Sequence, residues 1–325
     1  MAPLFVRKNM IIKVEEENIG LRLDQFLSQK IEQYSRNQIK KSILQGLVKK
    51  EGETLEPDYH IQENDIFTFE PPIIESSDLK PEKIDLDIIY EDQKVLVVNK
   101  KVGMVMHPGA GNWEGTLANA VLGRLKKQSD ILKTPLRAGI VHRLDKDTSG
   151  IVVVAKDDQT LEFLQRQFRE KITVKKYYAL VLGKPTSDEG IINAPIGRHR
   201  GFRKKFTILE NGKEAITHYK VLETFSSFSV TNDSIFISLL EVSPKTGRTH
   251  QIRVHLSKLG YPILGDQVYG REQTRISKSL GIKRQMLHAY YLKINLPEIG
   301  EKEFQIEIPK DMEEVISRFK SQIRK

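Results

Sequence analysis

Residues 137–156 read RAGIVHRLDKDTSGIVVVAK. A polar, charged run lies between Gly139 and Gly150, and the apolar run IVVVA that follows it is typical of a buried strand. Loops that a rigid sheet holds in place are where proteins commonly present catalytic groups. The segment therefore predicts a sheet and, before one of its strands, a loop that carries chemical groups.

Further short runs rich in β-branched and aromatic residues surround this segment. They are VLVVN before it and YYALVLG, ITHYKVLE and IFISLLEV after it. Helical spacing appears in LEFLQRQF, in THQIRVHLSKLG and near the C-terminus, where Met312, Val315, Ile316, Phe319 and Ile323 share a face. Many strands follow one another without an intervening helix, so we expect an α+β fold with a mixed, largely antiparallel sheet flanked by helices.

A smaller unit precedes this sheet. Leu23, Phe26, Leu27 and Ile31 fall at helical spacing, and Ser35 is a candidate cap for a second helix. The β-type runs LVKK and DIFTF follow, which predicts two helices packed on a small sheet.

The stretch FEPPIIESSDLKPEKIDL separates the two units. Its prolines remove backbone donors, and its Ser and Asp residues favour turns. We expect a linker at about residues 71–82, an N-terminal module over residues 1–75 and a larger domain over residues 83–325.

Length and composition narrow the class of protein. The chain has 325 residues, of which 39% are hydrophobic, enough for two folded domains. Its net charge of +9 favours a polyanionic partner. The absence of Cys excludes disulfides, thiol catalysis and Cys-ligated metals. No run reaches the ~18–20 apolar residues of a membrane span, and the N-terminus does not resemble a secretion signal, so we expect a cytoplasmic protein without a membrane partner.

The loop in residues 137–156 is compatible with several chemistries on its own. A calcium loop fails because its twelfth position, which needs Glu, is Lys156. A kinase loop fails because Leu144 interrupts His-Arg-Asp. A glycosidase pair of Asp145 and Asp147 has no assured geometry, and a turn in which Arg143 pairs with one Asp has no catalytic role at all.

A second dense segment, residues 239–270, reads LLEVSPKTGRTHQIRVHLSKLGYPILGDQVYG. Thr249 is a candidate cap for a helix that carries Gln251, Arg253 and His255. Arg248 and Arg253 near the start of this helix would oppose its dipole unless an anion lies nearby, either a carboxylate or a phosphate.

Together these segments resemble the pseudouridine synthases that modify uridines in large-subunit ribosomal RNA. The resemblance rests first on two motifs of the family. One is HRLD-x-x-TSG, which ends at Gly150, and the other is TGR-x-HQ-x-R-x-H…GD-x-x-YG, which begins at Thr246. Between them lies KKYYALVLG, in which Tyr177 takes the place of the family's active-site tyrosine. YEDQKVLVVNKKVGMVMHPG and GTLANAVL match the opening block, and the resemblance covers residues 14–308 or so. Lys101 stands where the family commonly has Pro, which alters the stiffness of that loop more than its chemistry.

The resemblance implies a role for each matched residue. Asp145 would be the carboxylate that acts at ribose C1′, Arg248 would supply the positive charge beside it, and Tyr177 would stack on the uracil. Arg143 would fill the space that the flipped base leaves, and Asp147 would be a structural turn residue. We expect neither a metal nor an organic cofactor.

The N-terminal module resembles the αL-type RNA-binding domain, through LRLD at residues 21–24, Ser35-Arg36 and GLV at residues 46–48. We therefore expect an RNA partner, with ribosomal RNA as the first expectation and transfer RNA as the alternative, no DNA partner and a monomeric protein. Basic residues spaced for phosphate contact are expected to bind RNA, both in this module and in the run RHRGFRKKF. They are Arg22, Arg36, Lys40, Arg198, Arg200, Arg203, Lys204 and Lys205.

Two other classes of function compete with an RNA-modifying isomerase. One is a non-catalytic RNA-binding or ribosome-assembly factor that keeps the fold, and the intact set of Asp145, Tyr177 and Arg248 argues against it. The other is a metal-dependent nuclease that uses Asp145, Asp147 and His142. The histidines lack the spacing of a zinc site, which disfavours a metal.

Overall fold

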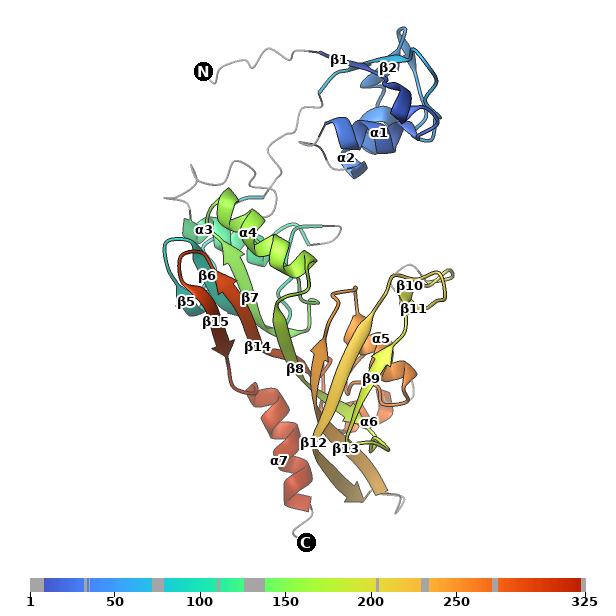
Figure 1. The fold of residues 1–325 in the computed structure, drawn as a ribbon. Coiled ribbons are helices and arrows are strands. Elements are labelled where there is room, and N and C mark those ends of the chain that lie inside the picture. The colour runs from blue at the N-terminus through green and yellow to red at the C-terminus, as the bar shows by residue number, and fades with distance from the viewer. Residues whose placement is uncertain are drawn as a thin grey trace. The chain divides into compact units, whose positions relative to one another are not determined.

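The computed structural model describes residues 9–31, 34, 36–71, 79–109, 112–125, 138–202, 205–228, 234–270 and 274–322. The chain divides into two compact units, Met1–Ser76 and Ser77–Lys325, which are described separately (Figure 1). Most of the linker predicted at residues 71–82 falls on residues 72–78, which lie outside the described residues. Within the described ranges, no helix is long and apolar enough to cross a membrane.

The first unit is a four-stranded antiparallel sheet with two helices packed on it, as predicted. The sheet order is β1-β4-β2-β3. The elements are β1 Met10–Lys13, α1 Leu23–Lys30, α2 Arg36–Leu44, β2 Val48–Lys50, β3 Glu53–Thr54 and β4 Ile66–Phe69. Its core contains Leu23, Phe26 and Leu27, because their helical spacing puts all three on the face of α1 that meets the sheet. The candidate cap Ser35 lies outside the described residues.

The second unit is built on a nine-stranded sheet. Eight of its strands follow the order β5-β6-β7-β14-β8-β13-β12-β9, and the ninth, β15, pairs with β14. The strands are β5 Asp87–Glu91, β6 Val95–Lys100, β7 Ser149–Ala155, β8 Val174–Leu182, β9 Glu189–Asn193, β12 Ile216–Phe228, β13 Ser234–Pro244, β14 Leu287–Leu296 and β15 Gly300–Gln305. Among the described pairs only β7 and β14 run parallel, so the predicted mixed, largely antiparallel sheet is confirmed. A separate ribbon consists of β10 Ile196–Arg198 and β11 Phe206–Ile208.

Helices cover both faces of this sheet. They are α3 Leu117–Leu125, α4 Asp158–Arg169, α5 Gln251–Lys258, α6 Thr274–Ser279 and α7 Lys310–Gln322. Alternate residues of β6 and β7 join different cores, because successive side chains of a strand point to opposite faces. Val152 and Val154 pack with α3, whereas Ile151 and Val153 pack with α4, which explains the uninterrupted apolar run IVVVA.

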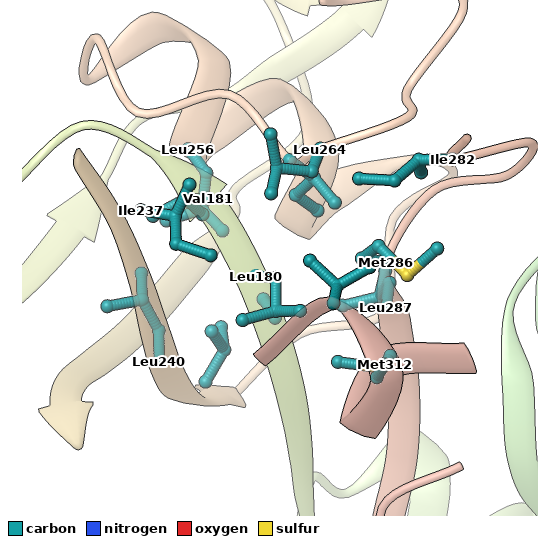
Figure 2. Packing of buried hydrophobic residues seen from close by; sticks show 14 of the residues in the cluster. Leu180, Val181, Ile237, Leu240, Leu256, Leu264, Ile282, Met286, Leu287 and Met312 are labelled. Carbon is teal, nitrogen blue, oxygen red and sulfur yellow. The ribbon is translucent and has the colours of Figure 1, made fainter. Parts of the chain in front are cut away.

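The other half of the sheet shares one large core. This cluster contains Leu180 and Val181 of β8 and Leu240 of β13, together with Leu256 of α5 and Met312 of α7 (Figure 2). Each of these residues is fully buried. Full burial of an aliphatic side chain of this size stabilises the fold by about 1.5–3 kcal/mol. This core therefore fixes α5, which carries much of the second sequence motif, against the strands.

One row of paired residues crosses five strands of the sheet. Lys100 of β6 pairs with Gly150 of β7, Gly150 with Ala289 of β14, Ala289 with Tyr177 of β8, and Tyr177 with Val242 of β13. The strand register thus brings the opening block, the loop before β7 and the predicted tyrosine to one line across the sheet. Chain segments that are far apart in sequence can meet at a single site along this line.

Gly150 permits the closest approach in that row. Its φ of 122° lies in a region that side chains with a Cβ rarely adopt. A Cβ atom there would lie 2.2 Å from the carbonyl oxygen of Ala289. Glycine at this position therefore allows β7 and β14 to pair directly after the loop.

Candidate active site

The loop that carries Asp145 is tied to the sheet at its C-terminal end. The amide of Thr148 donates to the carbonyl oxygen of Asp145 at 3.1 Å, which closes a turn. Gln285 donates to the Thr148 hydroxyl at 3.0 Å, and the hydroxyl of Ser149 lies 2.8 Å from Nδ1 of His288. These buried contacts fix the position of Asp145 relative to the start of β7.

A buried lysine holds the middle of the same loop. The ammonium of Lys100, only 1% exposed, donates to the carbonyl oxygens of Lys101, Met104 and Lys146 at 3.0, 2.9 and 2.9 Å. The amide of Gly103 also donates to the carbonyl of Lys146. Burial lowers the pKa of Lys100 to about 8. The end of β6 and the residue after Asp145 are thus joined through one side chain.

His142 anchors the N-terminal part of the loop. Its ring stacks on Phe168 with the centroids 4.7 Å apart, and its Nε2 accepts a hydrogen bond from the amide of Val153 at 3.1 Å. Burial, together with the charge of Lys175, lowers the pKa of His142 to about 3. His142 is therefore a neutral structural residue. In the part of the chain that the structure describes, no group of three or more His, Asp or Glu side chains could hold a metal ion.

The carboxylate of Asp145 forms an ion pair with Arg253. Nη1 of Arg253 lies 2.7 Å from Oδ2 of Asp145. The other edge of the guanidinium donates to Asp266, with Nε to Oδ2 at 2.7 Å and Nη2 to Oδ1 at 2.9 Å. Arg253 is 5% exposed and its guanidinium lies 5.2 Å from the ring centroid of Tyr269. One buried cation therefore bridges two carboxylates.

Asp266 is ionised in this arrangement. Burial alone would raise its pKa, but the hydrogen bonds and charge of Arg253 and the amides of Val268 and Tyr269 lower it. The two carboxylates in turn raise the pKa of Arg253 against the effect of burial. Arg253 and Asp266 are consequently both charged in the neutral range.

The prediction that Arg248 supplies the charge beside Asp145 is wrong, because Arg253 does so. Nε of Arg248 instead donates to the backbone carbonyl of Glu214 at 2.9 Å. Arg248 lies before α5, in the segment that ends at His250, whose backbone is left-handed with φ of 57°. Only Arg253 lies on α5 itself.

The N-terminus of α5 also differs from its prediction. His250, and not Thr249, is the capping residue, and it makes no side-chain cap bond. The side chain of Gln251 organises this turn, since its Oε1 accepts hydrogen bonds from Thr246 and from the amide of Arg248 at 2.7 and 3.0 Å. The threonine expected as a cap has no such role.

Two other polar residues of α5, Gln251 and His255, dock the helix on β12. Gln251 donates to the carbonyl of Ile216 and to the hydroxyl of Thr217, both at 2.9 Å. His255 is fully buried, with its ring nitrogens 2.9 Å from the Thr217 hydroxyl and the carbonyl of Ala194. Gln251 and His255 are therefore structural residues, and they leave Arg253 to face Asp145.

Tyr177 and Asp145 line one cavity of about 440 Å³, a size suited to a small organic group. Burial, together with the negative charge of Asp145, raises the pKa of Tyr177. The phenol therefore keeps its proton, and a role as a base is disfavoured. The exposed side chain of Arg143 stands at the border of the same cavity.

A second cavity of about 650 Å³ is also lined by Asp145. Arg143, Asp145, His250 and Arg253 line both cavities. Nδ1 of His250 lies 2.9 Å from the hydroxyl of Tyr269, and its Nε2 lies 3.8 Å from Oδ2 of Asp145. Burial lowers the pKa of His250 even though Asp145 opposes the shift. Sequence reasoning missed this neutral neighbour of the carboxylate, as it missed Asp266 and Lys100.

In the N-terminal unit, two of the predicted RNA-binding residues converge on one carboxylate. Arg22 and Arg36 each lie 3.1 Å from Oδ1 of buried Asp24. Burial would raise the pKa of Asp24, but the two guanidinium groups lower it. Their side chains stay 41% and 53% exposed, and Lys40 is exposed as well. The arginines are thus fixed in place yet open to a ligand.

The basic run of the second unit lies on the β10–β11 ribbon. Arg198 stacks on Phe206 at 5.2 Å, Arg200 is exposed, and Lys205 lies 5.9 Å from the ring of Tyr269. The hydroxyl of Tyr269 accepts a hydrogen bond from the amide of Phe206 at 2.9 Å, which ties the ribbon to the Arg253 cluster. The other two predicted residues, Arg203 and Lys204, lie outside the described residues.

Comparison with known proteins agrees with this architecture. Residues 94–258 match the RNA pseudouridylate synthase family, and residues 21–67 match the S4 domain. The chain belongs to the RNA pseudouridylate synthase family. The resemblance predicted from the sequence is thereby confirmed, as is an enzyme of the pseudouridine synthase class with an N-terminal RNA-binding domain.

Relatives of this pseudouridine synthase match it over nearly its whole length. The RNA pseudouridine synthase YlyB of Bacillus subtilis is 41% identical over 310 residues, which cover 95% of this chain and 97% of that protein. The ribosomal large subunit pseudouridine synthase D of Zymomonas mobilis is 39% identical over 93% of this chain and 95% of its own. Among solved structures, human RNA pseudouridylate synthase domain containing 1 superposes with a TM-score of 0.54 and 26% identity, over 74% of this chain and 96% of its own.

Proposed function

We propose that this pseudouridine synthase isomerises specific uridines of large-subunit ribosomal RNA and that the carboxylate of Asp145 acts at ribose C1′. One observation carries the catalytic part: Asp145 opens into the cavity that Tyr177 lines, while Arg253 holds its other side at 2.7 Å. A carboxylate that is fixed, charge-balanced and open to a ligand on one side suits a reaction that builds positive charge on a sugar carbon.

The reaction breaks the bond between uracil N1 and ribose C1′, and the bond electrons leave with the base. The base then turns, its C5 bonds to C1′, and C5 loses a proton while N1 gains one. Asp145 faces the sugar during these steps and stabilises C1′, either by its charge or by bonding to it. Arg253 keeps the carboxylate oriented, and Asp266 keeps Arg253 in place.

Tyr177 and Arg143 handle the base in this proposal. The ring of Tyr177 stacks on the uracil, and its protonated hydroxyl donates near the sugar. Removing the target base from its stack costs a few kcal/mol. The exposed Arg143 at the cavity border compensates for part of this cost by filling the vacated space.

Two findings favour ribosomal RNA as the substrate. Relatives of about 40% identity are named ribosomal large subunit pseudouridine synthase D, and the S4 domain presents Arg22 and Arg36 in fixed, half-exposed positions. Transfer RNA is the alternative substrate. We propose that the enzyme acts as a monomer, in the cytoplasm where ribosomes are made.

The proposal is tested with Asp145→Asn, which keeps the size of the side chain and removes its charge. Pseudouridines are mapped across cellular RNA with and without the protein, and turnover is then measured on a transcript of the mapped target. Asp145→Asn should abolish turnover and preserve RNA binding, whereas Asp147→Asn should reduce turnover far less. Normal product from Asp145→Asn would refute the mechanism. A site mapped to transfer RNA would overturn the substrate, and no site at all would favour a non-catalytic RNA-binding factor.

A further inference from the structure

The cavity between Asp145 and Tyr177 carries a large excess of positive charge. Asp145 is the only carboxylate among the described residues that line it. The cationic residues of its wall are Arg143, Arg169, Lys171, Lys175, Lys245, Arg248 and Arg253. Uracil and ribose are uncharged near neutral pH, so this excess has no partner in the reacting groups themselves. An anion that enters together with the uridine would balance it.

Some of these cations already have partners inside the protein. Arg253 binds two carboxylates, Lys171 pairs with Glu214 at 2.7 Å, and Arg248 donates to the backbone carbonyl of Glu214. Lys175 is different. Its ammonium lies 5.8 Å from the centroid of the Phe168 ring, and within the described ranges no carboxylate oxygen lies within 4.0 Å of it.

The position of Lys175 directs its charge toward the uridine pocket. It precedes Tyr177 by two residues on β8, and residues two apart on a strand share a face. Both side chains accordingly line the same cavity, about 7 Å apart along the strand. A group that binds Lys175 would therefore lie next to a base stacked on Tyr177.

A second cation, Lys245, adds to the electrostatic cost of keeping the Lys175 ammonium charged. Lys245 follows the end of β13, the strand beside β8, and lines the same cavity. Burial, together with the charge of Lys245, lowers the pKa of Lys175 to about 8. Two like charges held close together without a counter-ion destabilise the free protein, and a bound anion would remove that cost.

We propose that Lys175 and Lys245 form the binding site for one backbone phosphate of the target nucleotide. This inference rests on the proposed function, because it requires a uridine against Tyr177. Lys175 provides the inner, half-buried contact, and Lys245, which is exposed, provides the outer one. The phosphate then fixes the ribose against Asp145, so that Lys175 positions the substrate and takes no part in breaking the glycosidic bond.

The experiment pairs an enzyme variant with a substrate variant. Lys175→Met removes the charge and keeps most of the side-chain length. The RNA carries one neutral methylphosphonate in place of the phosphate on the 5′ side of the target uridine, or on its 3′ side. Single-turnover kcat/KM is measured for both proteins on all three RNAs. Lys184→Met, which removes an exposed lysine just after the other end of β8, is the matched control.

On fully charged RNA, Lys175→Met should lower kcat/KM by roughly 10- to 100-fold, the range of a lost hydrogen bond between charged groups. One of the two methylphosphonates should lower the activity of the parent protein similarly, and Lys175→Met should cause no further loss on that RNA. Lys175→Arg should recover most of the activity. Lys184→Met should behave like the parent protein on every RNA.

Stability provides a second readout, which a purely structural role of Lys175 would shift the other way. Because the cation is unbalanced in the free protein, Lys175→Met should raise the urea midpoint of unfolding while it lowers activity. If Lys175→Met lowers kcat/KM equally on all three RNAs, or on none of them, the proposed phosphate site is wrong. If the parent protein itself forms no pseudouridine, the proposed function fails, and that outcome is distinct from a failure of the phosphate site.

Discussion

Both carboxylate oxygens of Asp266 accept hydrogen bonds from Arg253, at 2.7 Å from Nε and 2.9 Å from Nη2. Such two-point pairing fixes the plane of a guanidinium as well as its position. The one nitrogen that is left, Nη1, points to Asp145 at 2.7 Å. The orientation of the proposed catalytic carboxylate is therefore set by a residue that does not touch it.

Asp266→Asn should impair both stability and turnover. The amide offers one acceptor and directs N–H groups at a buried cation, which leaves Arg253 poorly balanced. We expect a loss of roughly 3 kcal/mol in the free energy of unfolding and about a 10²-fold drop in kcat from the misplaced carboxylate. Urea unfolding and single-turnover assays measure the two effects. Asp311→Asn, in the two-point pair of Asp311 with Arg284, is the control and should spare turnover.

Separate substitutions of Arg253 and Arg248 should distinguish the roles of these two arginines. Arg253→Lys keeps the charge but cannot form three hydrogen bonds in one plane, so kcat should fall about 10²-fold. Arg248→Ala removes a contact to a backbone carbonyl and a cation at the cavity wall, so RNA binding should weaken while kcat stays within a few-fold of the parent protein. The opposite ranking of the two variants would restore Arg248 as the partner of Asp145.

Lys100 should give the protein an unusual dependence of stability on alkaline pH. Burial lowers its pKa from the ordinary 10.5 to about 8. Between these values the unfolded chain holds a proton that the folded chain has released, so the free energy of unfolding rises with pH there. Relative to Lys100→Met, the parent protein should gain up to about 3 kcal/mol between pH 8 and 10.5.

Urea unfolding of both proteins at several pH values measures this difference. All other titrating groups are common to the two chains and cancel. Parallel stability curves would show that Lys100 keeps an ordinary pKa. Lys100→Met should also slow turnover at neutral pH, because the carbonyl of Lys146 loses its ammonium donor.

Gly150→Ala should destabilise the fold strongly. The added methyl group would lie 2.2 Å from the carbonyl oxygen of Ala289 and would force β7 and β14 apart. We expect a loss of about 4 kcal/mol or more. Gly260→Ala also has a positive φ, of 94°, but nothing lies within 4 Å of its Cβ position, so it should cost about 1–2 kcal/mol. Similar melting temperatures for the two variants would contradict a specific clash at Gly150.

Deleting residues 1–76 should leave a folded catalytic unit with weaker RNA binding. The two compact units have separate hydrophobic cores. Thermal unfolding of the truncated protein should stay cooperative, and its KM for RNA should rise more than its kcat falls. Loss of the cooperative transition would mean that the catalytic unit cannot fold alone.

The sequence predicted the helices and strands better than it predicted the partners of the charged side chains. The uninterrupted apolar run IVVVA specifies β7, and the helical spacing in LEFLQRQF specifies α4. Both are local properties of the sequence. The choice between Arg248 and Arg253 depends on where α5 begins, and its capping residue His250, a non-glycine residue with a left-handed backbone, gives no sign of that start in the sequence. A clue was present in Asp266, a downstream acidic residue able to pair with a buried arginine.

Lys100 illustrates the same limit. It stands beside Lys101, and nothing in the sequence distinguishes the buried ammonium of one from the exposed ammonium of the other. The difference arises from pairing between β6 and β7, which joins residues 50 positions apart. Roles that depend on such distant pairing become visible only in three dimensions.

The place of β14 in the sheet has a consequence for how the protein is made. This strand lies between β7 and β8, yet both of those strands leave the ribosome long before it. Until β14 emerges, β7 and β8 each present an unpaired edge, and such edges invite pairing with other chains. Nascent chains that end before residue 287 therefore expose two unpaired strand edges, and this risk of aggregation ends only when β14 has been synthesised.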